Sequence, residues 1–258
     1  MNTENTTSKY SRRSVIGTGG FLTATAAFLA ACGKSTHTGI ARLGEAPAIE
    51  KLSDEPVTDA VLLRTAQSLE TMIATMLSDS AITSAVDAKS APLLAKFASA
   101  HTAQSSALAS LVTTNGGQPY DGTNEKLMIA YGQAALDLVK ESKDSTDAIT
   151  LAMALETLSA ATYQYFVSLT ANKGLRAQMM QIAATSSRRA AAAAQVLNGG
   201  TAGIVPSLNE NGEANVATLP SAFGLLSSVQ VSLGPVDAAS GTRAGVLMDT
   251  PSLNSFIY

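Results

Sequence analysis

The chain has 258 residues, of which 46% are hydrophobic, so it is long enough for one large domain or two small ones with a sizeable core. The formal net charge is −3 with no basic stripe, which argues against nucleic acid as a partner, and the absence of Trp argues against a binding surface of stacked aromatic rings. A single Cys excludes disulfide frameworks and Cys-based zinc or iron–sulfur sites, and two His leave little room for a His-rich metal site or a His-dependent triad.

Residues 1–32 have the pattern of a targeting segment. The pair Arg12 and Arg13 precedes an apolar run that is shorter than the roughly 20 residues of a membrane-spanning helix. The run ends at Leu29-Ala30-Ala31-Cys32-Gly33, where small residues before a Cys resemble a bacterial lipobox. We therefore expect a twin-arginine lipoprotein signal peptide and a mature protein exported to the outer face of the cell membrane. Its membrane partner would be reached through lipidated Cys32.

Cleavage before Cys32 would remove three basic residues and one acidic residue, which changes the net charge from −3 to −5. Because Cys32 is the only Cys, the mature protein would have no free thiol once this residue carries the lipid. Twin-arginine transport carries folded proteins, often with a cofactor already inserted. The remaining chain divides into a predicted tether at 33–54, a helical domain at 55–200 and a C-terminal extension at 201–258.

The helical domain has the period of amphipathic helices and few breakers. We expect four long helices, at 56–79, 88–113, 145–171 and 175–197, with Ser53 as the first N-cap and a further helical stretch at 124–141. Asn-Gly and Gly-Gly pairs after the second and fourth segments are stop signals. Two helical hairpins joined by one long crossover predict an all-α, ferritin-like four-helix bundle.

The C-terminal extension lacks the helical period of the preceding domain. Apolar and polar residues alternate at 228–233, and a second strand-like run covers 243–248, with a turn-rich stretch of Gly, Pro, Asp and Ser between them. This pattern predicts a small β-hairpin appended to the bundle. The last residues, Leu253 to Tyr258, are apolar enough to dock onto the protein.

Each of the four predicted helices has an apolar stripe that polar residues interrupt near its middle. The interruptions are Glu70 in the first helix, His101 and Gln104 in the second, Glu156 in the third, and Ser186 and Arg189 in the fourth. They fall at a similar depth, so bundling should bring them together. Because an isolated buried carboxylate is costly unless it is paired or binds metal, the two glutamates require a cation.

Short segments of the predicted helices also carry a family resemblance. They are Leu62-Leu63-Arg64-Thr65-Ala66 with Leu69-Glu70, the stretch 97–108, Ala154-Leu155-Glu156 through Tyr163, the stretch 182–197, and the closing Asp249-Thr250-Pro251-Ser252-Leu253-Asn254-Ser255. In their order and spacing, residues 57–200 resemble the exported ferritin-like proteins of actinobacteria. The resemblance implies a bundle whose carboxylates and histidines bind two iron or manganese ions. The general pattern is one Glu from each of two helices and Glu-x-x-His from each of the others.

The sequence keeps only part of that ligand set. Glu70 and Glu156 stand at the lone-Glu positions, His101 and Gln104 stand where this exported group tends to have histidines, and Ser186 and Arg189 stand at the Glu-x-x-His positions. A hydroxyl is a poor ligand, and a guanidinium has no lone pair to donate. A guanidinium between two carboxylates can instead balance their charge. We therefore predict a metal-free core in which Arg189 replaces the metal.

Several functions stay open at this point. The first is a metal-free, non-catalytic envelope protein, binding or structural, that acts through its surface. The second is an iron- or manganese-dependent oxidase or peroxide-handling protein, with either a full two-metal site or a reduced site of Glu70, His101 and Glu156. Ferritin-style storage ranks last, because a membrane anchor conflicts with a closed shell. Tyr163 is expected to be a core tyrosine bonded to a carboxylate, and a protein partner and a homo-oligomer are left open.

Overall fold

The computed structural model describes residues 58–200, 211 and 228–251, all within one compact unit, Ala41–Tyr258. The predicted signal peptide with Arg12, Arg13 and Cys32, the tether with Ser53, and the tail from Leu253 lie outside the described residues. Among the helices that are described, none combines the length and the apolar character needed to cross a membrane.

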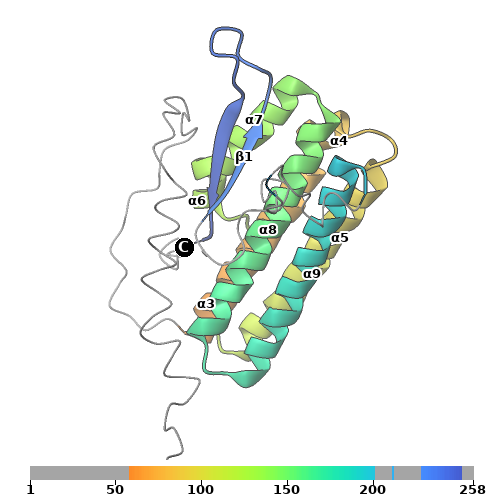
Figure 1. Cartoon of the computed structure of the whole chain (residues 1–258). Helices are drawn as coiled ribbons and strands as arrows, with labels where there is room; N and C mark the ends of the chain where they lie inside the picture. Colours follow the sequence, from red (N-terminus) through yellow and green to blue (C-terminus); the bar gives the residue numbers. More distant parts are fainter. Residues whose placement is uncertain (1–57, 201–210, 212–227, 252–258) are drawn as a thin grey trace, which may run out of the picture. The chain divides into compact units, whose positions relative to one another are not determined.

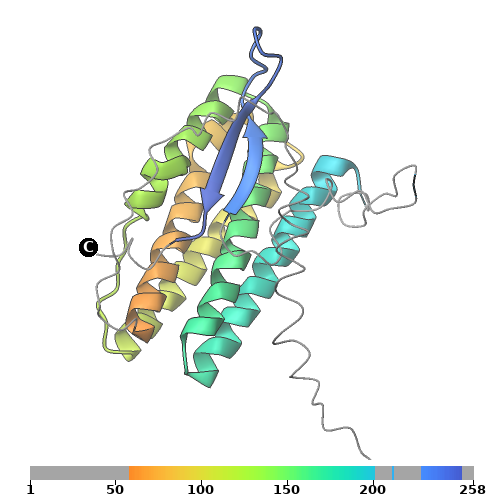
Figure 2. The same cartoon turned by 60° about the vertical axis from the view of Figure 1, so that its left-hand side comes forward.

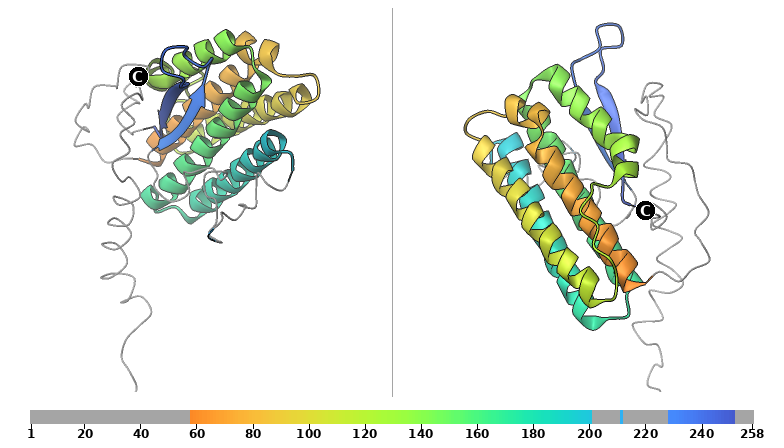
Figure 3. Two further views of the ribbon diagram at one scale, coloured as in Figure 1. Left: turned by 45° about the horizontal axis from the view of Figure 1, so that its top comes forward. Right: turned by 180° about the vertical axis from the view of Figure 1, so that it is seen from behind.

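Four long helices form two antiparallel hairpins (Figure 1). The first hairpin pairs α3 (Asp59–Ser78) with α5 (Ala91–Thr114), through the short helix α4 (Ser80–Ala85). The second pairs α8 (Ser145–Leu169) with α9 (Lys173–Asn198), and Figure 3 shows the four helices obliquely from above and from behind. These bounds confirm the predicted four-helix bundle. The helix α4 is an addition that the sequence pattern did not predict.

Local sequence signals explain where the helices begin and end. The hydroxyl of Thr58 accepts the Val61 N–H at 3.2 Å and caps α3, so this helix begins three residues later than predicted. The carboxylate of Asp144 accepts the Thr146 N–H at 2.8 Å and caps α8 in the same way. At the end of α9, Gly199 has φ of 70°, a left-handed conformation that Gly adopts without a Cβ penalty.

The crossover between the two hairpins is largely helical, as predicted for residues 124–141. It consists of α6 (Glu125–Leu127), a π-helical turn η1 (Met128–Gly132) and α7 (Gln133–Ser142). Asn124 caps this run by accepting the Leu127 N–H at 3.1 Å. The crossover thereby carries α7 back over the end of the bundle, where it packs against α4 and α8.

The C-terminal extension contains the predicted hairpin. Strand β1 (Ser228–Leu233) pairs antiparallel with β2 (Ala244–Asp249), with Val231 opposite Val246. The alternating apolar side chains of both strands are buried, and β1 packs on α8 and α7 (Figure 2). The two-stranded sheet therefore covers one side of the bundle.

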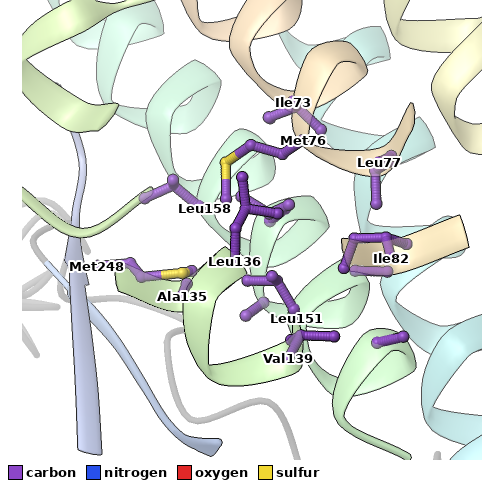
Figure 4. Close-up of a cluster of buried hydrophobic side chains, with 14 of the residues drawn as sticks. Ile73, Met76, Leu77, Ile82, Ala135, Leu136, Val139, Leu151, Leu158 and Met248 are labelled. Carbon is purple, nitrogen blue, oxygen red and sulfur yellow. The ribbon is translucent and has the colours of Figure 1, made fainter. Parts of the chain in front are cut away.

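Two clusters of apolar side chains make up the core. The larger cluster takes side chains from all the described helices and from the hairpin, and Figure 4 shows part of it: Ile73, Met76, Leu77, Ile82, Ala135, Leu136, Val139, Leu151, Leu158 and Met248. The smaller cluster lies toward the other end of the four long helices and includes Leu62, Leu108, Tyr163 and Phe166. In α5 and α9, the polar residues singled out above fall between the stretches that enter the two clusters. In α3 and α8, Glu70 and Glu156 lie at the end of the stretch that enters the larger cluster, next to Leu69 and Leu158.

Candidate functional site

A layer of charged side chains separates the two apolar clusters. Glu70 of α3, His101 of α5 and Glu156 of α8 are fully buried, with exposed fractions of 0%. Arg189 of α9 reaches the same layer, and its side chain is 15% exposed. Each long helix thus contributes one residue to this layer, at the depth that the interrupted stripes predicted.

The imidazole ring of His101 lies between the two carboxylates. Its Nδ1 is 2.5 Å from Oε2 of Glu70, and its Nε2 is 3.0 Å from Oε1 of Glu156. The two glutamates therefore flank opposite nitrogens of the same ring. When both nitrogens carry protons, each N–H donates to one carboxylate, and the ring becomes a bridge between α3 and α8 through α5.

Arg189 contacts one carboxylate only. Its Nε donates to Oε1 of Glu156 at 2.5 Å, and its Nη2 donates to the hydroxyl of Ser186 at 3.1 Å. The expectation that this guanidinium lies between Glu70 and Glu156 is wrong, because His101 occupies that position. His101 and Arg189 share Oε1 of Glu156, and the other oxygen, Oε2, is buried without a hydrogen-bond partner among the described residues.

Glu70 is held by hydroxyl groups on its second oxygen. The hydroxyl of Tyr163 donates to Oε1 of Glu70 at 2.7 Å, and that of Ser159 donates to the same oxygen at 3.4 Å. Tyr163 is thus the core tyrosine bonded to a carboxylate that the sequence predicted, although the carboxylate comes from α3 rather than from its own helix. Ser159 also lies 3.0 Å from the hydroxyl of Ser186, which closes a ring of contacts back to Arg189.

Ser159 is a residue that the sequence reasoning missed. It lies three residues after Glu156 and four before Tyr163, so helical spacing places it on the same face of α8. That spacing was the available signal. Gln104, by contrast, was predicted at the site but lies apart from it: its side chain is half-buried and makes no hydrogen bond to a described residue.

The charges of this layer compensate one another. Burial by itself would lower the pKa of His101, but the charge of Glu70 and the hydrogen bonds to Glu156 and Glu70 raise it from 6.5 to about 9. His101 is therefore an imidazolium at neutral pH. Two carboxylates then face two cations within hydrogen-bonding distance, and the cations are themselves neighbours, because Nη2 of Arg189 lies 3.4 Å from Nε2 of His101. Burial and the neighbouring Glu70 also raise the pKa of Tyr163 well above 10, so this phenol stays a hydrogen-bond donor.

This donor set does not fit a dinuclear metal centre. A histidine binds a metal through one ring nitrogen, yet both nitrogens of His101 face carboxylates, which holds the two glutamates on opposite sides of the ring. Arg189, which the family resemblance places at a ligand position, has no lone pair to donate. Among the residues that the structure describes, no group of three or more His, Cys, Asp or Glu side chains is arranged to hold a metal ion.

A family model described as the ferritin-like domain matches residues 23–199, which is more than half of the chain. No curated protein and no solved structure matches the chain.

Proposed function

Because the chain belongs to the ferritin-like domain family, we propose that it is an exported, lipid-anchored member in which side chains of the protein itself stand in for the dinuclear metal centre. In this proposal the bundle is a non-catalytic scaffold of the cell envelope that acts through its surface. It uses no cofactor. The chain would then keep the fold of its family without the metal chemistry that often accompanies that fold.

The observation that carries the proposal is the pairing of both buried glutamates with cations of the same chain. Removing one partner from a buried ion pair leaves an uncompensated charge, so such glutamates persist in a core only while a cation remains beside them. His101 takes this role for Glu70, and it shares the role with Arg189 for Glu156. Because the cations are covalently part of the chain, the bundle has no electrostatic need for metal.

The principal experiment is the metal content of the folded mature chain, residues 32–258, produced with iron and manganese supplied and measured by mass spectrometry. We expect no stoichiometric metal in a protein whose circular dichroism shows a helical fold. Two metal ions per chain would overturn the proposal and favour the metal-dependent oxidase function instead.

A reconstructed variant tests whether the ancestral geometry persists. The double change Ser186→Glu with Arg189→His rebuilds Glu-x-x-His on α9 and removes the guanidinium from Glu156. We expect this variant to gain iron or manganese binding, whereas the matched change Thr185→Glu with Arg188→His, on the neighbouring residues of the same helix, should not. A folded reconstructed variant that stays metal-free would contradict the proposed ancestry of the site.

The anchor and the export signal are tested separately in the bacterial host. Cys32→Ser should release the protein from the membrane fraction, and Arg12→Lys with Arg13→Lys should retain the precursor inside the cell. Metabolic labelling with a fatty acid should mark the unaltered chain and not the Cys32→Ser variant. A labelled Cys32→Ser chain would show that the lipid is attached elsewhere.

A second candidate function rests on Oε2 of Glu156. This oxygen is buried without a described partner, and a carboxylate oxygen in that state offers one ligand to a hard metal ion. The candidate is a metal-dependent oxidase or peroxide-handling protein with a reduced ligand set of Glu70, His101 and Glu156. Close to one metal ion per chain in the principal experiment would favour it.

A further inference from the structure

The charges of α9 are all of one sign. This helix contains Lys173, Arg176, Arg188 and Arg189 and no acidic residue, although the whole chain has a net charge of −3. Arg189 points into the core, while the other three cations are exposed and make no ion pair with a described residue. The exposed carboxylates lie elsewhere, on the connection after α4, on the crossover, on α7 and at the hairpin tip.

The exposed cations share one face of the helix. Successive residues of an α-helix are about 100° apart, which places Lys173, Arg176 and Arg188 within a sector of about 120°. Met180 lies within the same sector and is 50% exposed, one of the few large apolar side chains of the described chain that face solvent. We call these four residues the α9 outer face. Figure 2 shows α9 at the side of the bundle, away from the β-hairpin.

Helix stability accounts for only part of this arrangement. The N-terminus of a helix carries a partial positive charge, so cations in the first turn are unfavourable and carboxylates are favourable there. Lys173 and Arg176 stand in the first turn of α9, which has no acidic residue, and no basic residue stands in its last turn. Arg176 donates its Nε–H to the Thr170 carbonyl at 2.6 Å, at the C-terminal end of α8, so this cation also has a partner within the chain. Lys173 has no such contact with a described residue and stands against the helix dipole, which indicates a role outside the helix.

We propose that the α9 outer face rests on an anionic phospholipid surface and orients the bundle against the membrane. This inference builds on the proposed lipid anchor. A basic patch with an exposed apolar side chain is a second membrane signal that adds to a lipid chain. The acidic remainder of the surface is repelled by the same lipid, so the asymmetry selects one orientation.

Distance and charge favour lipid over other polyanions. Even fully extended, the predicted tether at 33–54 spans at most about 75 Å, so a bundle anchored at Cys32 stays close to the bilayer. Each cation near an anionic surface strengthens binding about fivefold, which for three cations gives on the order of 10²-fold. That gain is small for capture from solution and sufficient to orient a protein that the anchor already holds at the surface.

A single introduced tryptophan can report the docking, because the chain contains none. The mature chain, residues 32–258, has Cys32 as its only thiol, and coupling this thiol to a maleimide lipid attaches the protein to vesicles. The reporter is Met180→Trp, and its matched control is Ile129→Trp on η1, where the side chain is 68% exposed. The vesicles are phosphatidylcholine alone or phosphatidylcholine with phosphatidylglycerol.

We expect the emission of the Met180→Trp chain to shift to the blue, and to be quenched by brominated lipid, on the phosphatidylglycerol vesicles only. Adding Lys173→Glu and Arg188→Glu should lower the docking equilibrium at least about 25-fold. Adding Lys89→Glu and Lys140→Glu, two exposed lysines off α9, changes the net charge equally and should have little effect. The Ile129→Trp control should keep its emission on both vesicles.

Three results would overturn the inference. One is an unshifted Met180→Trp emission on the anionic vesicles. Another is an equal loss of docking in the variants that carry the two charge-reversal pairs, Lys173→Glu with Arg188→Glu and Lys89→Glu with Lys140→Glu. The third is a shift produced by polyphosphate or DNA in solution and not by vesicles, which would assign the α9 outer face to a soluble polyanion. Because the anchor is supplied chemically, none of these results depends on whether the cell attaches lipid to Cys32.

Discussion

At the scale of single residues, the charged layer depends on two unlike cations. Arg189 carries a guanidinium, whereas the charge of His101 exists only because two carboxylates raise its pKa. The two cations therefore differ in how they respond to substitution and to pH.

Removing the guanidinium should expose the cost of a buried carboxylate. In the Arg189→Met variant, Glu156 loses its 2.5 Å contact and keeps only His101, so we expect the free energy of unfolding to fall by about 3 kcal/mol. Adding Glu156→Gln should recover part of this loss, because the remaining side chain is neutral. Urea denaturation of the two single variants and the double variant gives the coupling. Arg188→Met, an exposed neighbour, should change stability by less than about 0.5 kcal/mol, and an equal loss there would contradict the pairing.

His101 should give the protein a stability that falls with rising pH. Its pKa is raised from 6.5 to about 9 in the folded protein, so its contribution is complete below pH 6.5 and is lost as the pH rises toward 9. The shift corresponds to about 3 kcal/mol between these limits. Urea denaturation from pH 6 to 10 measures the slope, and the His101→Gln variant should lack it. A ring that titrates near 6.5 by nuclear magnetic resonance would refute the imidazolium bridge.

At the scale of elements, one buried carboxylate ties the loop of the β-hairpin to the bundle, in addition to the apolar packing of β1 on α7 and α8 and the hydrogen bond from the Tyr131 hydroxyl to the Asp249 carbonyl at 3.0 Å. Asp147, in the first turn of α8, is fully buried and accepts the Gly234 N–H at 3.0 Å at the end of β1. It also pairs with Arg243, whose Nε donates to the Gly234 carbonyl at 2.7 Å. The two ends of the hairpin loop are thus fastened to the same point on α8.

Loss of Asp147 should release the hairpin while the helices stay folded. In Asp147→Ala the Gly234 N–H and the Arg243 guanidinium lose their acceptor, and we expect trypsin to cut after Arg243 at least about tenfold faster. Mass spectrometry identifies the cut, and circular dichroism checks the helices. The control is Asp144→Ala, which removes the N-cap of the same helix at a cost of about 1 kcal/mol and should leave the cutting rate unchanged. Cleavage of the Asp147→Ala chain at the rate of the unaltered protein would show that apolar packing alone holds the hairpin.

Periodic elements were predictable from the sequence, and contacts that join distant elements were not. The four long helices and both strands follow from hydrophobic period and from stop signals such as Gly199, because these act within a few residues. Equal depth of the polar interruptions predicted that Glu70, His101 and Glu156 meet. It could not predict which cation lies between the carboxylates, since that depends on side-chain direction in α5 and α9. The role of Asp147 was also hidden, because its partners are 87 and 96 positions away.

At the scale of the whole molecule, internal charge compensation changes how the fold relates to metal. In a metal-dependent bundle, the buried carboxylates remain uncompensated until the ions bind, so metal binding contributes to folding free energy. Here the four charges are covalently linked to the helices that pack around them. The bundle can therefore complete its core from the chain alone, which suits a protein that twin-arginine transport would carry already folded.

The stability of the unaltered protein should accordingly be independent of metal. A ligand present at one hundred times its Kd would stabilise the fold by about 2.7 kcal/mol, which for a protein of this size shifts Tm by several degrees. We expect the melting temperature, followed by circular dichroism, to agree within about 1 °C in chelator and in excess iron or manganese. Refolding from urea in chelator should also recover the full helical signal. The Ser186→Glu, Arg189→His variant serves as the positive control and should melt several degrees lower in chelator than with metal. If the unaltered chain shows the same sensitivity, a bound ion contributes to its core, and the compensation by His101 and Arg189 is incomplete.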